Sequence, residues 1–216
     1  SIEGYGGHVR VDDAGQSEEE RVIAVNTIHD ETERLTGLVN NLLSITRIEM
    51  GSIDLDRQRT RLGELLEDVA DSLGRLAVQK DISIERDLPH DLSPVSVDKD
   101  LLRIAINNLV SNAIKYNQAG GKITLSAEES DEALLIHVAD TGLGVSEEDQ
   151  ARIFEKFFRS ESHEVRERGG HGLGLSLSRQ IIELHDGQLS VESELGVGSK
   201  FTISLWKRSG LVKRAI

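Results

Sequence analysis

Glycines and polar side chains gather into four clusters in the last two thirds of this chain, and each cluster lies at the end of an apolar segment. The clusters begin at Asn107, Asp140, Gly169 and Gly196. Apolar segments with a helical or a strand period build a core, while glycine-rich ends form loops and turns. We therefore expect a mixed α and β domain with a polar site at the ends of its elements.

The apolar periodicity assigns an element to each segment between these clusters. Leu62, Leu65, Leu66, Val69 and Leu73 share one helical face and begin the second domain. Further helices are predicted over residues 99–116 and from the glycine cluster to about residue 185. Strands are predicted over residues 82–84, 95–97, 122–127, 134–139, 188–193 and 200–206, with a hairpin joining the third and fourth.

The N-terminal part of the chain is predicted to be one long helix. Ser17 with Glu20 three residues later is a capping signal, and no glycine or proline follows until Gly37. Apolar residues repeat every seven positions, as Ile28 and Leu35 do. The helix either packs on its own domain or belongs to a bundle, which its length favours. Residues 1–16 are predicted to be a frayed helix end and loop.

Composition excludes several classes of function. The formal net charge of −13 argues against nucleic acid as a partner, since phosphate binding needs clustered Lys and Arg. The chain of 216 residues has no cysteine, so disulfides, thiolate metal sites and a cysteine nucleophile are excluded. Its apolar runs, such as residues 133–136, are far shorter than the roughly 20 residues that cross a bilayer. We expect no membrane contact from this chain.

The first polar cluster carries two amides and an amine on one helical face. Asn108, Asn112 and Lys115 are spaced by four and three residues. Amide oxygens and a lysine suit a Mg²⁺ ion that bridges phosphates, because Mg²⁺ takes few protein ligands. The same pattern also occurs on ordinary solvated helix faces.

The other clusters offer an acceptor and an anion site. Asp140 leaves a strand directly into a glycine turn, so it is either a pinned acceptor for an exocyclic amine such as that of adenine, or a simple turn residue. The glycines of residues 169–174 precede a helix, where bare N–H groups and the helix dipole favour phosphate. This loop matches neither the P-loop nor the protein-kinase loop. Residues 196–202 form a turn between the last two strands.

In this order, the clusters resemble the N, G1, G2 and G3 boxes of the histidine-kinase catalytic domain, and residues 154–159 resemble its F box. The resemblance runs from Leu62 to Trp206. It implies the Bergerat fold, an α+β sandwich in which helices cover one face of a mixed sheet, here preceded by a fragment of a helical hairpin. ATP would lie under a lid over residues 158–169, which we expect to be mobile without nucleotide and ordered by ATP.

The resemblance also implies roles for individual residues. Asn108 and Lys115 would be catalytic, Asn112 would bind Mg²⁺ with support from Asn108, and Asp140 would hold the adenine amine. Tyr116 would flank the base. The set of residues expected to contact the nucleotide is completed by Asn112, Lys115, Gly142, Gly144, Lys156, Arg159, Gly170, His171, Gly172, Leu173, Gly174, Leu175 and Thr202. The family more often has Thr where this chain has His171.

Residues 31–49 resemble the second helix of the family's dimerisation hairpin, and residues 1–5 resemble the stretch after its phosphoacceptor box. The box itself is absent from this sequence, and His29 lacks the downstream residues of that motif. We therefore expect a partial dimerisation segment over residues 1–60, a catalytic domain over 61–206 and a basic tail over 207–216. Efficient autophosphorylation of this chain by itself is not expected.

The resemblance implies a protein-histidine kinase that transfers the γ-phosphoryl group of ATP-Mg²⁺ to a histidine, for relay to a response regulator in two-component signalling. Its expected partners are ATP, the receiver domain of a response regulator and a second copy bound through the N-terminal helices. A cytoplasmic location is expected, with any membrane anchor outside this chain. Three alternatives remain: an ATPase of the same superfamily, a nucleotide-binding module without catalysis, and a helical dimerisation protein.

Overall fold

The computed structural model describes residues 18–207 and divides the chain into two compact units, Ser1–Asn40 and Asn41–Ile216. Each unit is considered by itself. The expectations for the frayed start, for the stretch after the phosphoacceptor box and for residues 208–216 lie outside the described residues. No helix in the described part of the chain is both long and apolar enough to span a membrane.

Helix α1 (Glu18–Glu49) is a single helix of 32 residues, as its periodicity predicts. Its apolar stripe is largely exposed to solvent in this structure. Ile28 is 53% exposed, Leu35 44% and Val39 50%. Apolar side chains that are repeated along a helix and left in water are typical of a surface that packs against another helix.

The second unit is built on a five-stranded mixed sheet with the order β2-β4-β5-β7-β6. Its strands are β2 (Ser83–Asp87), β4 (Lys122–Glu129), β5 (Ala133–Asp140), β6 (Gln188–Glu194) and β7 (Gly198–Trp206). β2 runs parallel to β4, and the other neighbouring pairs are antiparallel. The predicted hairpin and the predicted α+β class are both confirmed.

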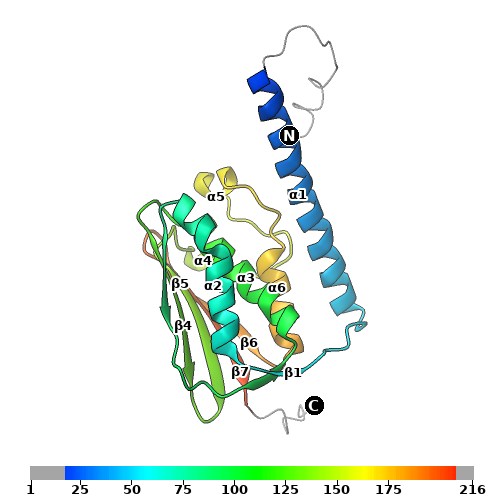
Figure 1. Cartoon of the computed structure of the whole chain (residues 1–216), viewed down its shortest axis with the longest axis vertical. Coiled ribbons are helices and arrows are strands. Elements are labelled where there is room, and N and C mark those ends of the chain that lie inside the picture. Colours follow the sequence, from blue (N-terminus) through cyan, green and yellow to red (C-terminus); the bar gives the residue numbers. More distant parts are fainter. Residues whose placement is uncertain (1–17, 208–216) are drawn as a thin grey trace. The chain divides into compact units, whose positions relative to one another are not determined.

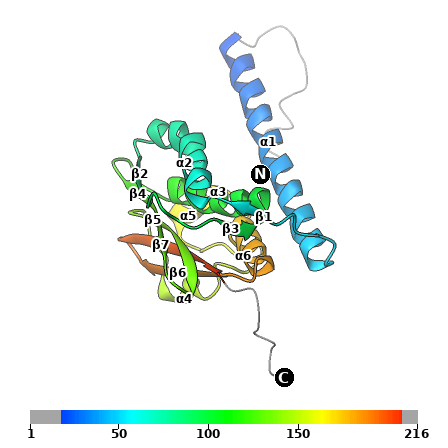
Figure 2. The same ribbon diagram turned by 60° about the horizontal axis from the view of Figure 1, so that its bottom comes forward.

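Three helices cover one face of this sheet: α2 (Leu62–Gln79), α3 (Lys99–Lys115) and α6 (Gly174–Leu184). Figures 1 and 2 show them side by side over the strands. The strands alternate, so that Ile136, Phe201 and Ile203 point toward the helices and are buried. Each fully buried side chain of this size contributes about 1.5–3 kcal/mol, and this burial fixes the helices against the sheet.

The start of α3 is tied to the end of α6. Asp98 caps α3, because its carboxylate accepts the backbone N–H of Leu101 at 3.0 Å. The backbone N–H of Asp98 in turn donates to Nε2 of the buried His185 at 2.9 Å. Nδ1 of that ring lies 2.7 Å from the carbonyl oxygen of Ile181 in α6. The two helices that carry the polar clusters therefore have a fixed relation.

Three short elements are not predicted by the apolar periodicity of the sequence. β1 (Gln58–Thr60) pairs antiparallel with β3 (Val95–Val97), although residues 1–60 are predicted from the sequence to be a partial helical dimerisation segment. Helices α4 (Glu147–Gln150) and α5 (His163–Glu167) lie in segments without a period. Elements of three to five residues span about one turn or one ladder step, so they show no detectable repeat.

Candidate nucleotide-binding active site

Helix α3 places two residues of the first polar cluster at a cavity beside the end of β5 and the start of β7. Asn112 and Lys115 from its last turns line a cavity of about 390 Å³. Asn108, one turn earlier, is not among the lining residues, and its amide donates to the carbonyl oxygen of Gly174 at 3.4 Å. Of the three residues on this face, two face the cavity and one supports its wall.

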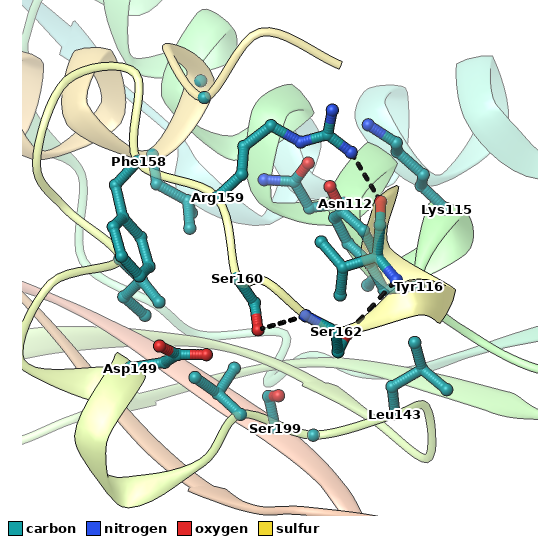
Figure 3. A pocket seen from close by; sticks show the side chains of 18 of the residues that line it. Asn112, Lys115, Tyr116, Leu143, Asp149, Phe158, Arg159, Ser160, Ser162 and Ser199 are labelled. Carbon is teal, nitrogen blue, oxygen red and sulfur yellow. Dashed lines mark hydrogen bonds between the residues drawn. The ribbon is translucent and has the colours of Figure 1, made fainter. Parts of the chain in front are cut away.

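Most of the sequence-predicted site residues line this one cavity. Figure 3 shows Asn112, Lys115, Tyr116 and Arg159 around it, with Ser199 and Leu143 at another wall. The predicted residues that line it are Asn112, Lys115, Tyr116, Asp140, Gly144, Arg159, His171, Gly172, Leu173, Gly174 and Leu175. They come from α3, β5 and the turn after it, residues 158–173 and the start of α6, as expected from the sequence.

Asp140 ends strand β5 and is a partly buried acceptor. Burial raises the pKa of its carboxyl above the ordinary value of 3.8, while hydrogen bonds from the backbone N–H groups of Gly142 and Ser199 oppose the rise. The Gly142 N–H lies 2.8 Å from Oδ1. A Cβ at Gly142 would lie 2.5 Å from the carbonyl oxygen of Tyr116, so this turn has room for glycine only. The carboxylate is thus held in one position at the cavity wall.

The glycine loop before α6 lies against both α3 and the F-box segment. A Cβ at Gly170 would collide with Nζ of Lys115, and one at Gly172 would lie 2.6 Å from the carbonyl oxygen of Phe158. Gly172 also has a φ of +69°, which side chains rarely adopt. The loop brings backbone groups and the amine of Lys115 to the N-terminus of α6, where the helix dipole favours an anion.

The segment predicted to be a lid contains α5; Arg159 makes a hydrogen bond within the segment, and Arg168 ties it to the residues around the C-terminus of α3. Arg159 donates to the carbonyl oxygen of Val165 at 2.5 Å. Arg168 donates to the carbonyl oxygens of Lys115 and Asn117 at 2.9 and 2.7 Å, beyond the C-terminus of α3. The expectation that this segment is mobile without nucleotide and ordered by ATP stays a prediction.

Tyr116 is half-buried beside this lid. Burial raises the pKa of its hydroxyl, and the charges of Arg159 and Arg168 oppose the rise. Nζ of Lys115 lies over the Tyr116 ring, 4.9 Å from its centroid. Its aromatic face and its position at the cavity wall suit contact with a planar base.

Five predicted residues do not line the cavity: Asn108, Gly142, Lys156, Gly170 and Thr202. Thr202 points to the opposite face of the sheet, where its hydroxyl lies 2.9 Å from Nδ1 of His137. Lys156 forms an ion pair with Glu49 and lines an adjoining polar depression, which shares Asp149, Phe158 and Arg159 with the cavity. Asn108, Gly142 and Gly170 instead pack against residues that do line the cavity, so Thr202 alone points away from it.

Sequence reasoning missed Ser199 and the apolar wall. Ser199, at 9% exposure, lines the cavity next to Asp140, and Phe201 lines it from the same strand. The two-residue period of a strand puts positions 199, 201 and 203 on one face and Thr202 on the other. This period was available in the sequence and would have selected Ser199 over Thr202. The remaining apolar wall is formed by Leu143, Val145, Ile153 and Leu195.

Comparison with known proteins agrees with this geometry. The family "Histidine kinase-, DNA gyrase B-, and HSP90-like ATPase" matches residues 97–209, which is more than half of the chain. The matched range begins just before α3 and ends after β7. It contains all the residues that line the cavity except Asn41, in the last turns of α1.

Two curated relatives are sensor kinases of cyanobacteria. The sensor histidine kinase RppB of Synechocystis sp. is 34% identical over 181 residues, covering 84% of this chain and 40% of the relative. The adaptive-response sensory kinase SasA of Gloeothece citriformis is 38% identical over 169 residues, covering 78% and 42%. The chain spans less than half the length of each of these relatives.

Solved structures share the fold over nearly the whole chain. The histidine kinase AdeS of Acinetobacter baumannii has a TM-score of 0.78 at 23% identity, covering 96% of this chain and 95% of that chain, a similarity of fold alone. Full-length ShkA in complex with AMPPNP has a TM-score of 0.77 at 28% identity, covering 94% and 42%. The histidine kinase ThkA in complex with response regulator protein TrrA has a TM-score of 0.75 at 25% identity, covering 96% and 57%.

The order of the polar clusters, their meeting in one cavity and these similarities all agree. The mixed sheet covered on one face by helices is the fold that the resemblance implied. This chain therefore belongs to the histidine kinase-, DNA gyrase B- and HSP90-like ATPase family, as a catalytic domain of the sensor histidine kinase type.

Proposed function

We propose that this chain binds ATP with Mg²⁺ in the cavity and transfers the γ-phosphoryl group to a histidine. One observation carries the proposal: Asp140, Asn112 and Lys115 line the same cavity as the glycine loop before α6. A buried acceptor, an amide oxygen, an amine and a helix N-terminus are complementary to the amino group, the metal and the phosphates of ATP. Residues 61–206 are proposed as the catalytic domain.

Each proposed role follows from the group that the residue presents. The Asp140 carboxylate would accept from the exocyclic amine of the base, and Tyr116 would lie against the ring. Lys115 and the N–H groups of the loop Gly170–Gly174 would hold the phosphates. Arg159 reaches the cavity from the lid segment, where a guanidinium can neutralise phosphate charge as transfer proceeds.

The donor set near Lys115 fits Mg²⁺. Asn112 offers one amide oxygen to the cavity, and Mg²⁺ takes its other ligands from phosphates and water. Among the described residues, no group of three or more His, Cys, Asp and Glu is placed to hold a metal ion. A metal bound by one amide would therefore depend on the nucleotide. It would supply charge neutralisation at the transferred phosphoryl group.

Asn108 favours phosphotransfer over hydrolysis. In the alternative ATPase, a glutamate at this position would act as the base that activates water. An amide has no basic group, and the Asn108 amide is engaged with the carbonyl oxygen of Gly174. Steady-state release of phosphate from ATP is therefore expected to be slow, and rapid release would favour the ATPase.

The proposed acceptor is a histidine on a separate or adjoining helical hairpin, because this sequence holds no phosphoacceptor box. The proposed next partner is a response regulator, supported by the ThkA structure, which contains one. We also propose a homodimer through α1, supported by its exposed apolar stripe. Light scattering on this chain tests the dimer, and a monomer at high concentration would contradict it.

The decisive experiment mixes this chain with γ-labelled ATP, Mg²⁺ and a purified hairpin that carries an acceptor histidine. We expect acid-labile label on the hairpin and none on this chain. The Asp140→Asn variant should label the hairpin much less at an ATP concentration near the dissociation constant of the unchanged chain, and a hairpin whose acceptor is changed to Gln should stay unlabelled. Label mapped to a histidine of this chain, or no label on any hairpin despite ATP binding, would refute the corresponding part of the proposal.

A further inference from the structure

A hydrogen-bonded cluster joins the turn after β5 to the turn between β6 and β7. At its centre is the hydroxyl of Ser193, in β6. The backbone N–H of Val145 lies 2.8 Å from Ser193 Oγ, the carbonyl oxygen of Gly198 lies at 2.8 Å, and the hydroxyl of Ser199 lies at 2.9 Å. These three neighbours fill the hydrogen-bonding capacity of one hydroxyl, which has one proton and two lone pairs.

The direction of each bond follows from the groups involved. The N–H of Val145 can only donate, and the carbonyl of Gly198 can only accept. The single proton of Ser193 therefore goes to Gly198, at 2.8 Å. The remaining bond, between the two serine hydroxyls, must then take its proton from Ser199.

The position of Ser193 is fixed from the backbone side as well. The side-chain amide of Gln150 in α4 donates to the carbonyl oxygen of Ser193 at 2.8 Å and to that of Val145 at 3.0 Å. Val145 is thus held at its N–H by Ser193 and at its carbonyl by Gln150. A hydroxyl whose backbone and neighbours are all held has little freedom to rotate.

Ser199 lines the cavity, as Figure 3 shows, and it is the partner of Asp140 in the pairing of β5 with β7. Its backbone N–H donates to the Asp140 carboxylate, so the two side chains are neighbours. Because the Ser199 proton is committed to Ser193, the hydroxyl offers only lone pairs to a ligand. The cavity therefore presents two acceptors side by side, the Asp140 carboxylate and the Ser199 oxygen.

We propose that Ser193 is a positioning residue for nucleotide specificity: by taking the Ser199 proton, it makes this wall accept a 6-amino purine and reject a 6-oxo purine. This inference rests on the proposed binding of ATP in the cavity. The amino group of adenine donates two protons, whereas the 6-oxo oxygen of hypoxanthine needs a donor that neither wall residue supplies. A buried acceptor left facing an acceptor is costly, and such a mismatch discriminates between ligands.

The test measures binding of ATP and of inosine triphosphate to the full chain by calorimetry. The Ser193→Ala variant frees the Ser199 proton, which can then donate to the 6-oxo oxygen. We expect the dissociation constant for inosine triphosphate, divided by that for ATP, to fall roughly fivefold in this variant. This is the effect of about one hydrogen bond. Ser193→Thr keeps the hydroxyl and should restore the ratio. Ser190→Ala, on an exposed serine of the same strand, should leave it unchanged.

A double-mutant cycle separates this role from general destabilisation. Ser199→Ala removes the second acceptor, and by itself it should also lower the ratio. In the Ser199→Ala background, adding Ser193→Ala should change the ratio less than twofold, because the two serines act through one bond. The Ser199→Ala measurement keeps the proposal testable even if Ser193→Ala does not fold.

The outcomes are distinct from those of the proposed function. Failure of the unchanged chain to bind ATP would overturn both. If the unchanged chain binds ATP but Ser193→Ala or Ser199→Ala leaves the ratio intact, the specificity proposal alone is overturned. The proposal would also be overturned if Ser193→Ala lowers the ratio equally in the unchanged chain and in the Ser199→Ala variant. Ser193 would then act independently of Ser199.

Discussion

Asp140→Asn is the substitution that separates binding from stability in this domain. In the unchanged chain, burial raises the pKa of Asp140, and this effect exceeds the opposing hydrogen bonds from Gly142 and Ser199. A raised pKa means that the folded chain tolerates the neutral carboxyl better than the carboxylate. Asparagine resembles that neutral form in size and charge. The nucleotide-free variant should therefore unfold at the same temperature as the unchanged chain, or a higher one.

The effect on ATP should have the opposite direction. The carboxylate can accept from the adenine amine, whereas the asparagine amide can turn an N–H toward that same donor. Loss of a hydrogen bond to a charged group costs about 1.5–3 kcal/mol, and about 1.4 kcal/mol is a factor of ten in affinity. The dissociation constant for ATP should therefore rise about ten- to hundredfold.

Calorimetric titration and thermal unfolding, on the same samples, test both statements. The pH dependence of stability gives a further test. Because the folded pKa of Asp140 is raised, its contribution to stability is full below the ordinary value of 3.8 and is lost as the pH rises through the folded value. Asp140→Asn has no carboxyl to ionise, so it does not lose this stability. The difference in unfolding temperature between the variant and the unchanged chain should therefore grow from about pH 4 upward. ATP affinity close to that of the unchanged chain, or a clearly lower unfolding temperature, would refute the reasoning.

Three further substitutions follow from the same structure. Gly144→Ala should destabilise the domain by more than about 2 kcal/mol, because its φ is +67° and a Cβ would collide with the carbonyl oxygen of Glu194; denaturant titration measures this. Arg168→Ala releases the lid segment from the C-terminal end of α3, so nucleotide-free proteolysis there should speed up several-fold. Lys207, assisted by Ser93, lowers the pKa of Glu129 from 4.5 to about 2, so Glu129→Gln should lose less stability than the unchanged chain as the pH falls from 4.5 to 2.

Matched controls exist for the first two. Gly196 has a φ of +82° but open space around its Cβ position, so Gly196→Ala should cost only about 1 kcal/mol of backbone strain. Arg166, exposed in the same lid segment, should leave proteolysis unchanged when replaced by Ala. Equal costs for the two glycines, or equal cleavage of the two arginine variants, would contradict the assigned contacts. For Glu129, an equal loss of stability in Glu129→Gln and in the unchanged chain between pH 4.5 and 2 would contradict the assigned ion pair.

Local chemistry in the sequence determined most of the elements of this protein. The helix from Leu62, the helix that carries Asn108 and Asn112, and the strand before Asp140 each have a period long enough to be recognised without the fold. The spacing of four residues between Asn108 and Asn112 also defines a face. Which of the two lines the cavity was decided only when α6 packed beside α3 and engaged Asn108 through Gly174.

The rest of the site is made by residues far apart in the chain. Ser193 meets Val145 across 48 positions, and Arg168 meets Lys115 across 53. Short strand β1 exists because residues 58–60 find a partner in residues 95–97. Such pairings depend on the strand order and on the closure of loops, and no period along the chain encodes them. The sequence therefore determined which chemical groups are available, while the tertiary structure decided which of them face one another.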